Sequence, residues 1–198
     1  MISLDIFADP VCPWCLIAKL QLDRALESRP GHQLAIAWQP FRLNPMIPKG
    51  GVDRIAHLKN RPGPDLTQEM SALTAQAAAL GLVLNPARTE PNTTDAHRLI
   101  YWAGLEGAQT RVMDGLMRAH WQDARDIGDH ATLVAISEMA GMTKGLAARL
   151  LATDADRDVI DAREAHARQR GVSVAPTFIL GDLHVVTGAQ PAELWQNV

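Results

Sequence analysis

Hydrophobic and polar residues alternate at the start of the chain, which predicts a β-strand over residues 2–8. Apolar residues then recur at helical spacing over residues 16–26, and Pro13 suits the first turn of this helix, where its missing N–H is not needed. Pro30 and the glycine after it end the helix, and the apolar residues 34–38 predict a second strand. Strand, helix and strand in this order indicate a βαβ unit.

The middle of the chain has a helical pattern. Prolines and glycines make residues 39–64 irregular and argue against a long helix there. After them, helices are predicted at 67–80, from a capping region at 92–95 through Trp102, and at 108–122, 130–140, 143–151 and 154–170. Consecutive helices without a strand predict an all-helical insertion, with bounds at residues 61–169.

Strands return after Gly171. Residues 177–180 and 183–186 are strand-like, and the Gly181-Asp182 turn between them predicts a β-hairpin. A short closing helix follows near Trp195. The order β-α-β, helices, β-β-α predicts an α/β protein with a thioredoxin-like fold. Its core comprises residues 1–60 and 170–198, and the helical insertion separates the two halves.

Composition and charge narrow the range of functions that the sequence allows. The chain has 198 residues, a net charge of -3 and a pI near 6.1, with no basic cluster, so no nucleic-acid partner is expected. Its first residues lack the basic and apolar regions of a signal peptide, and no apolar stretch approaches the roughly 18 residues of a membrane span. We therefore expect no membrane association and a cytoplasmic location.

The two cysteines are the most informative residues. Cys12 and Cys15 would close only a minimal loop, so a disulfide between them would stabilise the fold little. They follow a strand and open a helix, whose N-terminus offers free N–H groups and positive potential that favour a thiolate. Cys12 is therefore predicted to be a partly exposed nucleophile that forms a mixed disulfide with substrate. Cys15, one turn further on, is predicted to resolve it.

Other interpretations of the cysteine pair are weaker. Zinc needs about four ligands, and the seven histidines show no partner spacing, so no metal is predicted. An inert buried pair is disfavoured because the prolines at 10 and 13 place the cysteines at a turn. A Cys-x-x-Cys pair at a helix start within a βαβ unit favours redox chemistry.

A second element is Pro176, which directly precedes the first strand of the predicted hairpin. In a thioredoxin fold, a proline here is expected to be cis and to face the cysteine pair. Its neighbouring backbone groups would then bind substrate as an added strand does. Pro13, Trp14, Ala175 and Pro176 are the predicted substrate-binding residues.

With these elements the sequence resembles the DsbA-like thioredoxin superfamily, and within it the FrnE-like branch. The similar segments run in order along nearly the whole chain: 9–15, 38–45, 91–93, 96–97, 171–178 and 188–191. The resemblance implies a thioredoxin core with a helical insertion, Cys12 as nucleophile, Cys15 as resolving thiol and Pro176 as the cis proline. It also implies a thiol–disulfide oxidoreductase that acts on a protein or a small-molecule disulfide.

Two alternatives stay open. The same superfamily contains glutathione-dependent 2-hydroxychromene-2-carboxylate isomerases and kappa-class glutathione transferases, which typically carry Ser where this chain has Cys12. A chaperone-like binding module with an idle cysteine pair is the second. Val174 and Ala175 depart from the residues common in the superfamily, so substrate preference does not carry over. We expect no bound cofactor, leave glutathione open as a redox partner, and leave a homodimer open.

Three further residues are weighed for roles near the site. Asp5, in the first strand, is either a proton acceptor for Cys15 or a solvated carboxylate. His97 is expected to pack or cap its helix rather than line the cleft. Arg42 would add positive potential near Cys12 by analogy with the fold.

Overall fold

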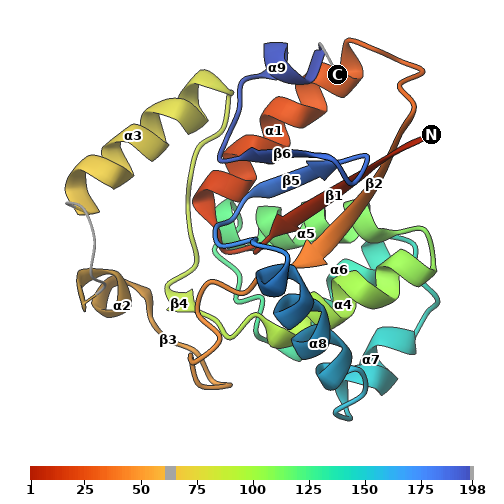
Figure 1. Ribbon diagram of the computed structural model, residues 1–198. Helices are drawn as coiled ribbons and strands as arrows, with labels where there is room; N and C mark the ends of the chain where they lie inside the picture. Colours follow the sequence, from red (N-terminus) through yellow and green to blue (C-terminus); the bar gives the residue numbers. More distant parts are fainter. Residues whose placement is uncertain (61–65, 197–198) are drawn as a thin grey trace.

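The computed structural model describes residues 1–60 and 66–196 and is built around a four-stranded sheet (Figure 1). The end of the predicted irregular stretch, up to Pro64, and the first residues of the predicted insertion lie outside the described residues. The strand order is β2-β1-β5-β6. The strands are β1 (Ile2–Ala8), β2 (Leu34–Pro40), β5 (Thr177–Leu180) and β6 (His184–Thr187).

The strand directions are those of a thioredoxin-like sheet. β1 pairs in parallel with β2 through the crossover helix α1 (Pro13–Glu27), while β5 runs antiparallel to both β1 and β6. The predicted β-α-β … β-β-α order is therefore confirmed. It brings the end of β1 beside the start of β5, because Phe7 lies opposite Thr177.

The two faces of the sheet have different cores. Leu4, Ile6 and Phe178 point to the face covered by α1 and α9 (Ala192–Gln196). Phe7 and Ile179 point to the other face and pack against residues at the end of α8 (Arg157–Gln169). This division follows from the two-residue period of a strand.

Helices form most of the segment between the two halves of the sheet. They are α2 (Arg54–Asn60), α3 (Leu66–Ala79), α4 (Thr94–Leu105), α5 (Gln109–Trp121), α6 (His130–Met139), α7 (Leu146–Leu151) and α8. Figure 1 shows α4 to α7 gathered at one end of the molecule and α2 and α3 at its side. A two-residue strand pair, β3 (Val52–Asp53) with β4 (Thr89–Glu90), joins the entry to α2 and the entry to α4.

The helical segment shares its core with the sheet. One buried cluster includes Leu4 and Cys15 of the sheet half together with Trp102, Leu116 and Leu133 of the helices. Helices α5 and α6 approach closely at Gly115, where an added Cβ would lie 2.7 Å from the Ile136 side chain. The division into a core and an insertion is thus one of chain order, with packing continuous between them.

Candidate active site

The cysteine pair lies where β1 passes into α1. Cys12 is the N-cap residue of α1, and its Sγ accepts a hydrogen bond from the Cys15 backbone N–H at 3.3 Å. The Cys12 N–H in turn donates to the Asp9 carbonyl at 2.9 Å, which fixes the loop. Both cysteines are free thiols. The N-terminus of α1 therefore directs an N–H group at the Cys12 sulfur.

Cys15 is held as a neutral thiol. Its side chain is 1% exposed, and burial raises its pKa well above the usual value. The hydrogen bond with Cys12 and the negative charges of Cys12 and Asp9 act in the same direction, while a hydrogen bond with the Asp9 backbone lowers the pKa. The second thiol of the pair thus keeps its proton near neutral pH.

The loop before β5 covers the Cys12 sulfur. Cys12 Sγ lies 3.7 Å from the Ala175 carbonyl oxygen, and the Ala175–Pro176 peptide bond is cis. The sequence-based expectation of a partly exposed Cys12 is wrong for this structure, because Cys12 is only 2% exposed beneath this loop. Val174, one residue further from the sulfur, is 49% exposed.

The structure brings together the residues that the sequence singled out. Pro13 and Trp14 are half-buried in the first turn of α1, and Ala175 is half-buried across from Cys12. The contact between Cys12 and Ala175 joins segments that lie 163 residues apart in sequence. It arises because β1 and β5 are neighbours in the sheet.

A cavity of about 220 Å³ adjoins the cysteine loop. Residues from α2, β4 and α5 line it beside the loop, among them Arg54, Glu90 and Trp121. The Arg54 guanidinium lies over the Trp121 ring at 5.0 Å from its centroid, and the Trp121 Nε1–H donates to the Pro10 carbonyl. Burial lowers the pKa of Arg54, and the charge of Glu90, 3.5 Å away, opposes that shift.

Asp9 is a buried carboxylate at this site, although its place before Pro10 predicts only a turn. It is 0% exposed and lies directly before the cysteine loop. Its Oδ2 accepts hydrogen bonds from the Leu43 N–H at 2.8 Å and from the Thr93 hydroxyl at 3.3 Å. His97 Nε2 lies 3.6 Å from Asp9 Oδ1. These partners come from distant segments, so no local sequence pattern indicated them.

Asp5 lies on the other face of the sheet. Its Oδ1 accepts a hydrogen bond from the Gln39 side chain, and it lines a cavity with Val159 and Arg163 of α8. The residues on either side of it in β1 face α1. Asp5 therefore points away from Cys15, whereas the charge of Asp9 contributes to the raised pKa of the Cys15 thiol.

Arg42 does not act as a free positive charge at the cysteines. Its guanidinium donates to Glu164 Oε2 at 2.7 Å and to Asp161 Oδ1 at 2.6 Å, both on α8, and to the Thr94 hydroxyl at 3.1 Å. The expectation that it adds positive potential near Cys12 is wrong, because two carboxylates neutralise it. Arg42 instead ties the segment after β2 to α4 and α8.

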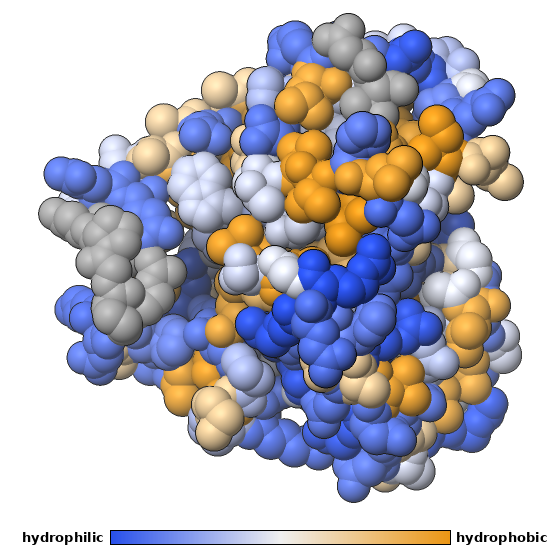
Figure 2. Space-filling model, in the orientation of Figure 1, coloured by the Kyte–Doolittle hydropathy of each residue, from blue (hydrophilic) through white to orange (hydrophobic). Residues whose placement is uncertain are grey.

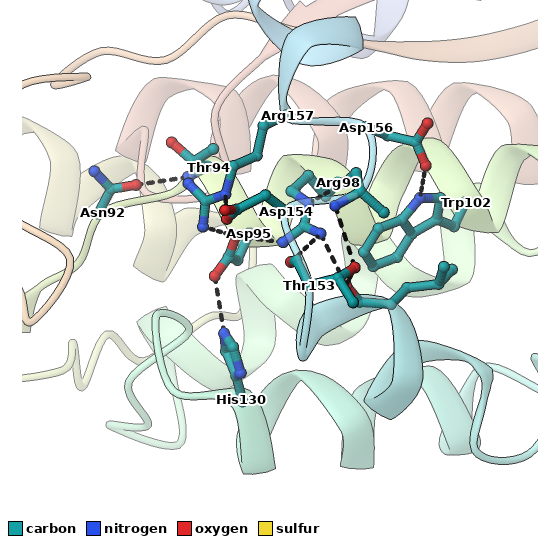
Figure 3. A network of polar contacts seen from close by, with 12 residues as sticks. Asn92, Thr94, Asp95, Arg98, Trp102, His130, Thr153, Asp154, Asp156 and Arg157 are labelled. Carbon is teal, nitrogen blue, oxygen red and sulfur yellow. Dashed lines mark hydrogen bonds and ion pairs between the residues drawn. The ribbon is translucent and has the colours of Figure 1, made fainter.

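A polar network supports the helix that carries His97 (Figure 3). The Asp95 carboxylate in α4 accepts hydrogen bonds from Arg98, Arg157 and His130, each at 2.8 Å. Arg98 is 0% exposed and also donates to three carbonyl groups near α7. The network joins α4, α6 and α8, and it fixes the start of α4 beside the cysteine loop.

This sheet, with a cysteine pair at the start of its first helix and a proline loop facing it, is the fold of the DsbA-like thiol–disulfide oxidoreductases. Comparison with known families agrees: the chain belongs to the family described as DSBA-like thioredoxin domain, which matches residues 3–198.

Two individual proteins are similar to this chain over nearly its whole length. A probable DsbA oxidoreductase from Streptomyces coelicolor, SCO1869, has a similar structure with a TM-score of 0.88 and 29% identity, over 100% of this chain and 88% of its own. The uncharacterized protein YwbO of Bacillus subtilis is 25% identical over 99% of this chain and 94% of its own.

Two more distant structures share the fold. A 2-hydroxychromene-2-carboxylate isomerase has a TM-score of 0.71 and 20% identity, over 94% of this chain and 89% of its own. The cytosolic disulfide reductase DsbM of Pseudomonas aeruginosa, solved with GSH, has a TM-score of 0.67 and 17% identity, over 98% of this chain and 96% of its own.

Among the described residues, no helix combines the length and the apolar character needed to cross a bilayer.

Proposed function

We propose that this protein exchanges disulfides through the Cys12-Pro13-Trp14-Cys15 dithiol. Cys12 attacks a substrate disulfide and forms a mixed disulfide, and Cys15 resolves it and releases the reduced substrate. The observation that carries the proposal is the hydrogen bond from the Cys15 N–H to Cys12 Sγ at the helix N-terminus, beside a Cys15 thiol that keeps its proton. The two thiols therefore have the unequal environments that the two steps require.

Substrate binds, in this proposal, along Pro13, Trp14, Ala175 and Pro176. The Ala175 carbonyl lies 3.7 Å from Cys12 Sγ, so a substrate strand paired with this loop would bring its sulfur next to Cys12. Either a protein or a small molecule satisfies this geometry. Glutathione is proposed as a redox partner, supported by the related DsbM structure that contains GSH. The expected cytoplasmic location and the homodimer stay predictions.

A glutathione-dependent isomerase is the second candidate, because the structure of a 2-hydroxychromene-2-carboxylate isomerase shares the fold. In that case Cys12 would engage glutathione and Cys15 would be incidental. A chaperone-like module with an idle cysteine pair would need neither thiol.

One substitution separates these candidates. The Cys15→Ser variant should accumulate a stable mixed disulfide on Cys12 when it meets a disulfide substrate, and mass spectrometry should detect the adduct. The Cys12→Ser variant, as the matched control, should form none. Isomerase turnover that survives Cys15→Ser, or client binding that is indifferent to both changes, would instead support the other two functions.

A further inference from the structure

The cavity beside the cysteine loop contains a buried cation with an unused hydrogen-bond donor. Arg54 is 6% exposed and lines this cavity of about 220 Å³. Its Nε forms no hydrogen bond with any residue that the structure describes. Glu90 Oε2, 3.5 Å away, forms an ion pair with this nitrogen but not a hydrogen bond. A buried N–H group without an acceptor is costly, so an acceptor supplied by a ligand would be favourable here.

Trp121 fixes Arg54 relative to the cysteine loop. The Trp121 Nε1–H donates to the Pro10 carbonyl at 3.1 Å, and the Arg54 guanidinium lies over the Trp121 ring, 5.0 Å from its centroid. A cation over the face of an aromatic ring is attracted to the ring without using its N–H groups as a pair of donors to oxygen. The planar guanidinium is therefore left suited to a carboxylate, which it can bind through two parallel hydrogen bonds.

The cavity extends to both neighbours of the nucleophilic cysteine, because Val11 and Pro13 line it. Consecutive Cα atoms are about 3.8 Å apart, so its wall lies about one residue from Cys12. Leu58 and Met70 add apolar surface that can cover a short hydrocarbon stem. The volume is below the roughly 300–1,000 Å³ of pockets that enclose a whole ligand. The cavity therefore fits one end of a small molecule rather than a polypeptide strand.

The other ionisable groups among the described lining residues do not compete for an anionic group. Glu69 and Glu90 have the opposite charge, and both have further interactions within the protein. His57 of α2 is only half-buried, so solvent and salt screen its charge more than that of Arg54. Arg54 is therefore the cation that an anionic group would meet inside this cavity.

We propose that the cavity binds the carboxylate end of a small-molecule disulfide and that Arg54 holds this carboxylate. The proposal rests on the dithiol function proposed above and assigns it a substrate class, namely low-molecular-weight disulfides with a carboxylate on a short stem. The Cys12 thiolate attacks the nearer substrate sulfur and forms a bond to it. The substrate S–S bond breaks, and the far half leaves as a thiolate with the electron pair. Arg54 determines specificity and takes no part in the electron transfer.

The experiment compares two disulfides that differ in charge, dithiodipropionate and its diamide, in the full-length Cys15→Ser protein. Mass spectrometry follows the formation of the mixed disulfide on Cys12. The ratio of the two rate constants is divided by the ratio for a free small-molecule thiol, which removes the intrinsic difference in reactivity. The corrected ratio should favour the dicarboxylate about 10-fold, as expected for a charge-assisted hydrogen bond, and Arg54→Gln should bring it to about one.

The matched control is Arg88→Gln in the same background. The Arg88 carbonyl accepts the Arg54 backbone N–H at 2.9 Å, but the Arg88 side chain is 92% exposed. This variant removes the same charge from a neighbouring residue and should keep the 10-fold preference, because an exposed charge contributes little. A corrected ratio near one with Arg54 intact would overturn the proposal. So would a ratio that Arg54→Gln leaves unchanged while both rates fall together, which is the result of a purely structural role.

A competition experiment tests the same site if Arg54→Gln does not fold. Butyrate has the carboxylate and the stem but no sulfur, so it should slow the attack of Cys12 on dithiodipropionate, whereas sodium chloride at the same ionic strength should not. Equal effects of the two salts would contradict the inference. If neither disulfide forms an adduct on Cys12 in any of these proteins, it is the dithiol function that fails, and the substrate class fails with it.

Discussion

Two thiols three residues apart differ in what surrounds them, and this difference is the basis of the site at the scale of single residues. Cys12 Sγ accepts an N–H from the helix that follows it, whereas burial keeps Cys15 protonated. Burial outweighs the hydrogen bond with the Asp9 backbone, which by itself lowers the Cys15 pKa. This asymmetry supports the proposed roles, in which Cys12 attacks the substrate and Cys15 resolves the mixed disulfide.

His120 behaves as a neutral buried base, and this makes stability depend on pH. Its pKa is lowered to about 3 by burial, so between pH 3 and its ordinary pKa of about 6.5 the unfolded chain binds a proton that the folded chain does not. The stability that neutral His120 contributes is therefore fully present above about pH 6.5 and is lost as the pH falls toward 3. Between pH 7 and pH 5, His120 should lower the free energy of unfolding by about 2 kcal/mol.

Urea unfolding at pH 7 and pH 5 tests the expectation for His120. The His120→Phe variant should lose about 2 kcal/mol less than the wild type between the two pH values. His184→Phe, at an exposed position of β6, serves as the control and should keep the wild-type difference. Equal losses in all three proteins would show that His120 titrates normally.

The residues of the site that carry a local signature are predictable from the sequence. The spacing of Cys12 and Cys15 and the place of Pro13 in the first helical turn indicate a helix N-terminus on their own. Asp9 was missed, because its carboxylate is defined by Leu43, Thr93 and His97, which lie far along the chain. A turn-forming Asp-Pro pair has the same local pattern whether its carboxylate is buried or solvated.

Among the elements, α4 depends most on its neighbours, and Asp95 is where they meet. Burial alone would raise the pKa of Asp95, but hydrogen bonds from His130 and Arg98 and the charge of Arg157 lower it. Arg98 has no exposure and extends the same network to carbonyls near α7 (Figure 3). Because α4 also carries His97, the network fixes the position of His97 next to Asp9.

Asp95→Ala should therefore destabilise the protein by about 3–5 kcal/mol, because it leaves the Arg98 charge buried without its partner. Asp154→Ala is a matched control: Asp154 also pairs with Arg157 at 2.8 Å but is 89% exposed, so its loss should cost at most about 1 kcal/mol. Guanidinium unfolding of both variants measures the two values. Similar losses in both would show that burial of the network contributes nothing.

Most elements follow from local patterns. The predicted strand at 2–8 coincides with β1. The predicted helices at 108–122 and 130–140 agree with α5 and α6 to within one residue at either end. The pattern failed at α2, a seven-residue helix within a segment rich in proline and glycine. There the short β3–β4 pair and the Arg54–Glu90 contact hold the helix against the body of the protein. Such tertiary contacts override local propensity and leave no periodic signature.

At the scale of the whole molecule, the buried core runs without interruption from the sheet into the helices. A continuous core predicts one cooperative unfolding transition, so tryptophan fluorescence and far-UV circular dichroism should give the same midpoint. Two separated transitions would mean that the predicted insertion folds as an independent unit.

Hydrophobic residues also lie on the surface of the hairpin. Figure 2 shows them over the region where Figure 1 places β5 and β6. Leu183 and Val185 of this hairpin region are 81% and 63% exposed.

The redox equilibrium of the Cys12–Cys15 pair tests the central claim most directly. The protein is equilibrated in glutathione buffers of graded potential, the thiols are alkylated, and mass spectrometry counts the labels. We predict a reversible two-electron transition between about -120 and -270 mV, the span of known oxidoreductases of this kind. The absence of any transition, or a stable glutathione adduct on Cys12 without a Cys12–Cys15 disulfide, would contradict the account and favour a glutathione-dependent isomerase.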